Sequence, residues 1–236
     1  MGWRALAAAA ADLAWGGACA ACAAPGPVLC PGCAGLLRRL PTQAVPVRPG
    51  VPPTIARGDY ADELRAVILA CKERQGLGLV PMLAELVTGS AAALLHERWS
   101  GAAVRVAPIP SARSTIGERG FDLTGMMAGR VAVTLRGVGM DVRGWRALRP
   151  VRRSADQAGL GIAERAANRR ASLVARPGEP VQVLLIDDIV TTGATLAEAR
   201  RALTVAGHSV LGAAVVAATP RTGTPGTRTA SRTGIH

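Results

Sequence analysis

Two adjacent carboxylates and a hydroxyl-rich glycine loop follow a strongly apolar run near the end of the chain. Residues 183–186 are typical of a buried strand, and Asp187 and Asp188 come directly after them. Neighbouring strand residues point to opposite sides, so this pair would place acceptors around the mouth of a cleft, suited to sugar hydroxyls and a metal-bound ligand. An ordinary strand–turn–helix connection with a threonine cap is the alternative. A loop follows the acids that would open a helix and enclose a phosphate with its backbone N–H groups and hydroxyls. Its residues are Thr191, Thr192, Gly193, Ala194 and Thr195.

Four cysteines near the N-terminus have the spacing of a metal site. Cys19 and Cys22 form one C-x-x-C pair, Cys30 and Cys33 form a second, and seven residues that include Gly and Pro separate the pairs. This spacing predicts that each pair lies on a tight turn. Four thiolate sulfurs suit a closed tetrahedral site, so the pattern predicts structural Zn²⁺. Two disulfides, a redox pair and an iron–sulfur cluster are the alternatives, although the surrounding sequence lacks the strand–helix context of a thioredoxin-like site. Cys71 lies on an apolar helical face and is expected to be a packed core thiol.

The chain of 236 residues is strongly basic, and nearly all of its positive charge is arginine. Its formal net charge is +12, and Lys72 is the only lysine among 28 basic residues. The planar arginine fork suits phosphate and diphosphate, and the excess charge would attract polyanions. Base-composition bias in the coding DNA explains most of these arginines equally well, so the charge does not establish a nucleic-acid partner. Aromatic residues make up 3% of the chain, which disfavours an RNA binder that stacks bases.

Alternating strand and helix patterns must position these residues. A helix is expected over 3–13, and apolar residues at helical spacing predict two helices ahead of the sheet, over 60–72 and 77–95. The later alternation predicts an α/β fold with a doubly wound, mainly parallel sheet, in which ligands bind at the carboxyl ends of strands. The predicted strands are 104–108, 144–148, 181–187 and 210–217, and the helices between them are 121–135, 157–171 and 194–206.

We expect three parts in the chain. They are an N-terminal helix with the four-cysteine module over 1–50, an α/β domain over 51–218 and a disordered tail over 219–236, with a proline-punctuated connection at the first boundary. The alanine-rich start imitates a lipoprotein signal, but Asp12 interrupts it. Gly and Pro recur through the uncharged stretch 13–37, so no membrane span and a cytoplasmic location are expected.

Residues 183–195 resemble the phosphoribosyl diphosphate (PRPP) motif of type I phosphoribosyltransferases. That motif has four apolar residues, two acids, two apolar residues and then T-T-G-x-T, and this chain matches every position. The resemblance implies that Asp187 and Asp188 hold the ribose hydroxyls and that the loop from Thr191 to Thr195 holds the 5′-phosphate. It also implies Mg²⁺ carried on the diphosphate and ribose, and the doubly wound α/β fold.

Beyond this motif, the chain is similar to the ComF family, named for a role in DNA uptake during natural competence, over nearly all of its length except the tail. The four cysteines, the PRPP motif and the helix 60–72 with Leu64 and Arg65 carry part of the resemblance. Two further blocks are Pro108, Ile109, Pro110, Arg113, Arg119, Gly120 and Phe121, and Arg152, Ser154, Gln157, Leu160, Glu164, Arg165 and Asn168. The chain departs from the usual family residues at Asp122, Leu123, Ser154 and Leu173, which bears on fine specificity.

Arginines near the motif have alternative interpretations. Arg113 and Arg119 follow the first predicted strand of the parallel sheet, where a diphosphate would accept charge-assisted hydrogen bonds from them; they would otherwise be solvated surface arginines. The arginine-rich stretch 143–153 is a lid over the substrate, a path for nucleic-acid phosphates or a solvated basic loop.

The resemblance implies a PRPP-binding protein. If catalytic, it would displace diphosphate from C1 of PRPP with a nitrogen nucleophile, mainly by positioning and charge neutralisation. The alternative is a non-catalytic accessory protein of DNA uptake or repair that binds single-stranded DNA or a helicase-like partner. The family fold suggests a homodimer, and the acceptor base or amine is not readable from the sequence.

Overall fold

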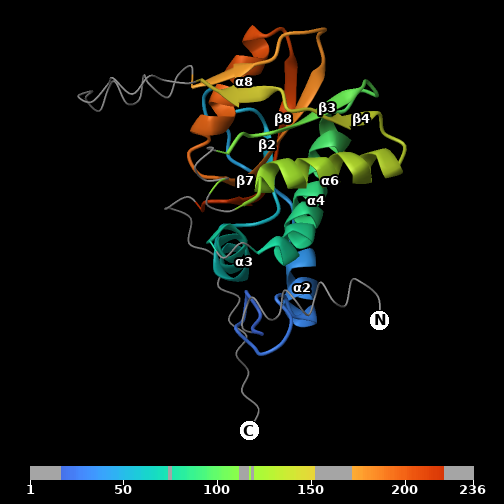
Figure 1. Ribbon diagram of the computed structural model, residues 1–236. Coiled ribbons are helices and arrows are strands. Elements are labelled where there is room, and N and C mark those ends of the chain that lie inside the picture. Colours follow the sequence, from blue (N-terminus) through green and yellow to red (C-terminus); the bar gives the residue numbers. More distant parts are fainter. Residues whose placement is uncertain (1–16, 74–75, 112–116, 118–119, 152–171, 221–236) are drawn as a thin grey trace, which may run out of the picture.

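A computed structural model (Figure 1) describes residues 17–73, 76–111, 117, 120–151 and 172–220. The helices expected over 3–13 and 157–171 lie outside these residues, as does most of the expected tail. The three-part division of the chain therefore stays a prediction.

The described chain is built around a mostly parallel, six-stranded sheet. Its strand order is β1-β2-β8-β7-β3-β4, and within it β1 alone runs antiparallel to its neighbour among the described strands. Central strands β7 and β8 are apolar over most of their length because both of their faces pack into the core. The strands are β1 (Gln43–Ala44), β2 (Thr54–Ala56), β3 (Val104–Pro108), β4 (Val142–Gly144), β7 (Gln182–Val190) and β8 (Ser209–Ala218); β5 (Leu148–Pro150) and β6 (Leu173–Ala175) form a separate antiparallel pair.

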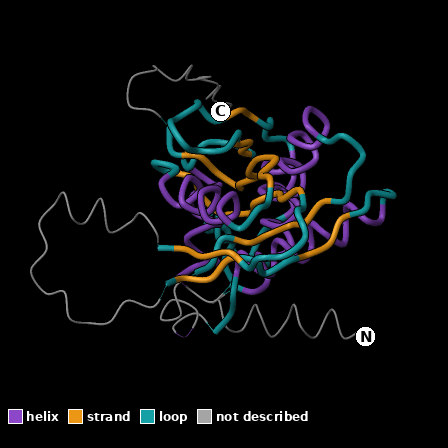
Figure 2. Tube along the Cα trace, turned by 90° about the horizontal axis from the view of Figure 1, so that it is seen from above, coloured by secondary structure: helices purple, strands orange, loops and turns teal. Residues whose placement is uncertain are grey.

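Alternate residues of β7 enter two different cores. Leu184 and Ile186 belong to the core that includes α4 and α6, whereas Val183 and Leu185 belong to the core that includes α8. This is the period-two alternation of a strand buried on both sides. Figure 2, seen from above, shows the strands running through the body of the molecule with helices around them. The helices of the domain are α3 (Asp62–Glu73), η1 (Leu77–Leu79), α4 (Val80–Arg98), α6 (Leu123–Gly137) and α8 (Ala194–Val205).

One described helical stretch, Leu77–Arg98, has the length and composition of a membrane span, with a mean hydropathy of 1.6. More than half of its most apolar window, 56%, is buried inside the structure. Ser90 in this helix donates to the carbonyl of Val215 in β8 at 3.0 Å, and Val87, Ala91 and Leu94 are buried in the core. Packing against the sheet thus accounts for the apolar composition of α4.

The predicted α/β class with a mainly parallel sheet is confirmed, and so is the strand over 104–108, which is β3. The strand predicted over 144–148 is wrong, because 142–144 and 148–150 form two separate short strands with different partners. The expectation that two helices precede the sheet is also wrong, since β1 and β2 precede α3. β2 has three residues and pairs with the distant β8, so no local pattern marked it.

The N-terminal segment ends in a short helix that the sequence pattern did not predict, α2 (Pro31–Arg38). In Figure 1, α2 and the preceding segment lie beyond one end of α4, away from α8. Leu37 of α2 is fully buried and joins the main core, and Arg38 forms an exposed ion pair with Glu85 of α4 at 2.8 Å.

Candidate functional site

The two acids of the motif lie inside the last part of β7 rather than after it. β7 extends to Val190 because β8 offers a backbone partner as far as Ala218. Asp188 therefore shares the face of Leu184 and Ile186, and Asp187 lies on the opposite face of the strand. The acids thus stand on both sides of the carboxyl end of a central strand, which is where open α/β sheets bind ligands.

Asp188 has a cationic partner that the sequence pattern did not indicate. The Nζ atom of Lys72, in the last turn of α3, lies 2.7 Å from Oδ2 of Asp188. The two side chains are 19% and 13% exposed, so this ion pair is largely withdrawn from water. A helix from the first third of the chain thereby contributes the charge that neutralises an acid of the motif.

The surroundings of Asp187 favour its protonated form more than water does. Burial, together with the charge of Asp188, raises the pKa of Asp187 to about 8, although the Asp188 N–H and the Lys72 ammonium oppose this shift. The Asp188 N–H donates to Oδ1 of Asp187 at 2.9 Å. The two acids are therefore linked through the backbone as well as by their charges.

The loop after β7 turns the chain directly into α8. Gly193 is the N-cap of α8 and has a left-handed conformation, with φ of 78°. Thr191, Thr192 and Thr195 are exposed, whereas Gly193 is buried beneath Val51. Because the first amides of a helix have no intrahelical acceptor, the exposed hydroxyls and these N–H groups together form a candidate anion-binding cradle.

Residues from the connection before β2 hold this loop from outside. The Arg48 guanidinium donates to the backbone carbonyl of Thr191, and Val51 packs on Gly193. Nothing in the local sequence marked Arg48 or Val51 as part of the site, since they lie far from the loop along the chain. The predicted proline-rich connection is thus a structural support for the cradle.

The Gly193→Ala variant is expected to be destabilised by more than the about 1–2 kcal/mol that a left-handed alanine costs. An added Cβ would lie 2.7 Å from Cγ2 of Val51, so the loop must also shift. Gly207→Ala is the matched control, because Gly207 has φ of +88° but no atom within 4 Å of the added Cβ. Urea unfolding of both variants measures the difference; equal losses would show that Val51 does not constrain the loop.

The predicted diphosphate arginines, Arg113 and Arg119, lie outside the described residues. The ends of the segment that carries them are anchored beside the acids. The Ile109 N–H donates to the Ile186 carbonyl at 2.9 Å, and the Thr124 hydroxyl donates to the Ile109 carbonyl at 2.8 Å. The segment therefore leaves the sheet next to β7.

Asp122, one of the departures from the family pattern, is the N-cap of α6. Its Oδ1 accepts from the Gly125 N–H at 3.1 Å, and its Oδ2 accepts from Arg146 at 2.7 Å.

The described part of the basic stretch 143–153 is not a single loop, because β4 and β5 occupy its two ends. Arg143 and Arg149 are exposed on short strands, and Arg146 is held by Asp122.

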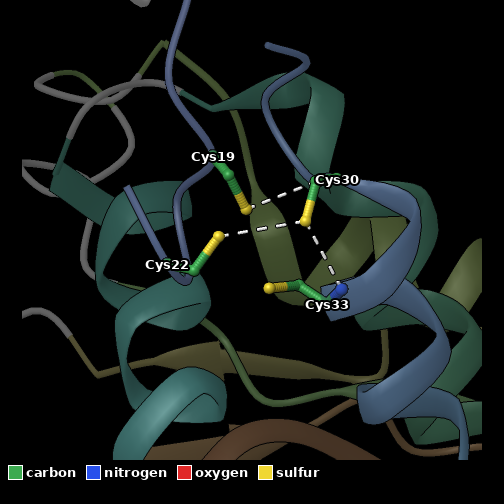
Figure 3. Close-up of side chains that lie close together, drawn as sticks. All are labelled: Cys19, Cys22, Cys30 and Cys33. Carbon is green, nitrogen blue, oxygen red and sulfur yellow. Dashed lines mark hydrogen bonds between the residues drawn. The ribbon is translucent and has the colours of Figure 1, made fainter. Parts of the chain in front are cut away.

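The four cysteines of the N-terminal module converge in space, as Figure 3 shows. Their Sγ atoms all lie within 4.8 Å of one another, close enough to bind a single metal ion, and all four are free thiols. Sulfurs around zinc at about 2.3 Å in a tetrahedron are separated by about 3.8 Å. The Cys22 and Cys30 sulfurs are 3.9 Å apart. A thiol set with this spacing fits zinc and not a disulfide, in which the sulfurs are about 2.05 Å apart.

Two different backbone structures position the thiols. The first pair lies in a tight turn closed by the Ala23 N–H, which donates to the Cys19 carbonyl at 2.8 Å. The second pair occupies the start of α2, where Cys30 is the N-cap and Pro31 is the first helical residue. We expected two tight turns, so the second is a correction: Pro31 favours the start of a helix.

Backbone amides and neighbouring sulfurs perturb the thiols. Burial would raise the pKa of Cys19, but hydrogen bonds from the backbone of Cys30, Cys22 and Ala21 lower it to about 6. Burial and the neighbouring thiols raise the pKa of Cys33. A cluster in which one thiolate forms readily and crowds its neighbours is suited to a cation that takes up the shared negative charge.

A scan against protein-family models found no family that matches this chain, and a search of curated proteins found no match.

Proposed function

We propose that the protein binds PRPP, or a related phosphorylated ribose, at the carboxyl end of β7. The observation that carries this proposal is the continuity of the site: two carboxylates on one strand lead without interruption into a hydroxyl-lined loop and a helix N-terminus. The 5′-phosphate would occupy the loop from Thr191 to Thr195, and the ribose hydroxyls would meet Asp187 and Asp188. These features and the mainly parallel sheet are consistent with a type I phosphoribosyltransferase fold, and the four-cysteine cluster is compatible with membership in the ComF family.

The adjoining segment would hold the diphosphate. Arg113 and Arg119 lie on the chain between β3 and α6, both of which are anchored beside β7. If the protein turns over PRPP, the bond from C1 to the diphosphate oxygen breaks, diphosphate leaves with the electron pair, and a nitrogen nucleophile forms the new bond to C1. The nucleophile's proton is released to solvent. Positioning and neutralisation of the leaving group would supply most of the rate.

The donor set at the end of β7 fits Mg²⁺, a hard cation that proteins bind through one or two carboxylates together with substrate phosphates. Asp187 and Asp188 would face the ion on the diphosphate and ribose. When bound, Mg²⁺ supplies positive charge that stabilises the departing diphosphate.

We further propose that the N-terminal cysteines hold a structural zinc ion. Four thiols with no open coordination position are typical of a structural site and not of a catalytic one. The module would then contribute a surface next to α3 and α4 rather than chemistry. A redox pair or an iron–sulfur cluster would be revealed by the metal content of the purified protein.

Calorimetric titration of PRPP into zinc-loaded protein, with and without Mg²⁺, tests the proposed function. We expect binding that requires Mg²⁺, and such binding would justify a screen of bases and amines for diphosphate release. Absence of binding in both titrations would refute the assignment of the site.

An accessory role on single-stranded DNA is the second candidate, and the exposed side chains of Arg143 and Arg149 favour it. Asp122 neutralises Arg146 and Asp141 lies 3.9 Å from Arg143, so the positive charge on these strands is partly compensated. We therefore rank this candidate second. A steep loss of DNA retention with rising salt would support it, because each phosphate contact releases counterions.

A further inference from the structure

Lys72 of α3 and Asp188 of β7 form an ion pair that is largely withdrawn from water. Their ion pair, 2.7 Å long, joins a helix of the first third of the chain to the acid of a central strand. Lys72 is also the only lysine in a chain whose other basic residues are arginines. Lysine presents a compact charge with three donors, whereas arginine presents a planar fork, so the two side chains are not equivalent partners for one carboxylate oxygen.

The position of Lys72 is set by packing and not by the ion pair. Val67, Ile68 and Cys71 of α3 are fully buried in the main core, which fixes the rotation of the helix. In Figure 1, α3 lies between the sheet and the N-terminal segment that contains α2. The ammonium is therefore presented to Asp188 by a rigid element, and a rigid partner restricts the rotamers of the carboxylate.

The Lys72–Asp188 ion pair is expected to contribute little to the free energy of unfolding. The desolvation penalty of two charges offsets much of the energy of their attraction, so a partly buried ion pair is weak evidence for a stabilising role. Its location is more informative. The ion pair lies just before the loop Thr191–Thr195, where an uncompensated Asp188 carboxylate would repel a ligand that carries phosphates.

We infer that Lys72 is a positioning residue of the site: it holds Asp188 in one orientation and cancels its charge, so that a phosphorylated sugar can present its hydroxyls to the acid. This inference rests on the proposed function and assigns α3 to the sugar-binding part of that site. Lys72 acts through Asp188 and not on the phosphate in the loop.

The test compares three probes on full-length, zinc-loaded protein: PRPP with Mg²⁺, ribose 5-phosphate and inorganic phosphate. In Lys72→Met we expect the affinity for the two sugar phosphates to fall by about 10-fold or more, whereas affinity for inorganic phosphate changes by less than about 2-fold. Lys72→Arg should recover part of the loss, because it restores charge without the same geometry. Arg98→Met removes an exposed charge at the end of α4 and serves as the control.

A double-mutant cycle separates positioning from direct contact. If Lys72 acts through Asp188, Lys72→Met adds no further loss of PRPP affinity in an Asp188→Asn background. Three results would overturn the inference. They are additive losses of PRPP affinity in the double variant, equal losses of affinity for sugar phosphates and inorganic phosphate in Lys72→Met, and an unchanged affinity in Lys72→Met. Lys72→Gln provides a second neutral variant if Lys72→Met does not fold. Wild-type protein that binds none of the probes would refute the proposed function and the inference with it, whereas normal binding by both wild type and Lys72→Met refutes the inference alone.

Discussion

Chelation of the proposed zinc ion is expected to unfold residues 17–40 while the sheet stays folded. This segment buries few large side chains of its own; Leu37 is the one that is fully buried in the main core. Segments below about 40 residues usually need a metal or disulfides to hold a fold. Structural zinc contributes an apparent free energy of about 10–16 kcal/mol in small metal-dependent modules.

The measurement is hydrogen exchange before and after chelation, together with the zinc content of the protein. The amides of Ala23 in the cysteine turn and of Cys30 at the start of α2 should lose protection, whereas those of β7 should keep it. The Arg38–Glu85 ion pair is about half exposed and contributes little to holding the module on α4. Unchanged protection in the cysteine turn after complete metal removal would contradict the prediction.

Substitution of single cysteines provides the matched comparison. Cys33→Ser should abolish stoichiometric zinc binding, because it removes one of four ligands. Cys71→Ala removes a fully buried thiol that is not among the four, so this variant should keep its zinc even though it loses packing. Wild-type protein that is purified without zinc and with intact thiols would contradict the proposed site.

The Asp188→Asn variant is expected to lose PRPP affinity by at least about 100-fold, equivalent to about 2.7 kcal/mol. The amide keeps the shape of the carboxylate but loses its charge and two of its acceptor sites for ribose hydroxyls. It also leaves the Lys72 ammonium, which is 19% exposed, without its carboxylate partner. Uncompensated charge in a largely buried position disturbs the site as well as the binding contact.

Calorimetry with PRPP and Mg²⁺ measures the loss, and urea unfolding shows how much of it reflects a less stable fold. Asp141→Asn is the control, since the Asp141 side chain is 61% exposed and lies 3.9 Å from Arg143. That variant should bind PRPP as the wild type does. Unaltered PRPP binding in Asp188→Asn would count against the whole assignment of the acids.

Much of the candidate site could be predicted because the residues that indicate it are close together in the sequence. The apolar run, the acid pair and the glycine loop occupy consecutive residues, and their order alone predicts a strand that leads into a helix N-terminus. The spacing of the four cysteines likewise predicts a metal site. Strands such as β3 were found with their bounds because buried parallel strands are continuous apolar runs.

The sequence by itself therefore determined the α/β class, the acid pair with its threonine loop and the four-cysteine cluster, because each is encoded by residues a few positions apart. Tertiary structure alone decided what surrounds them. The Lys72–Asp188 pair, the Arg48 contact with Thr191, whose residues are 143 apart in sequence, and the β2–β8 pairing all join distant segments. Such contacts depend on how helices and strands pack around a common core, and packing has no signature in a local window of sequence.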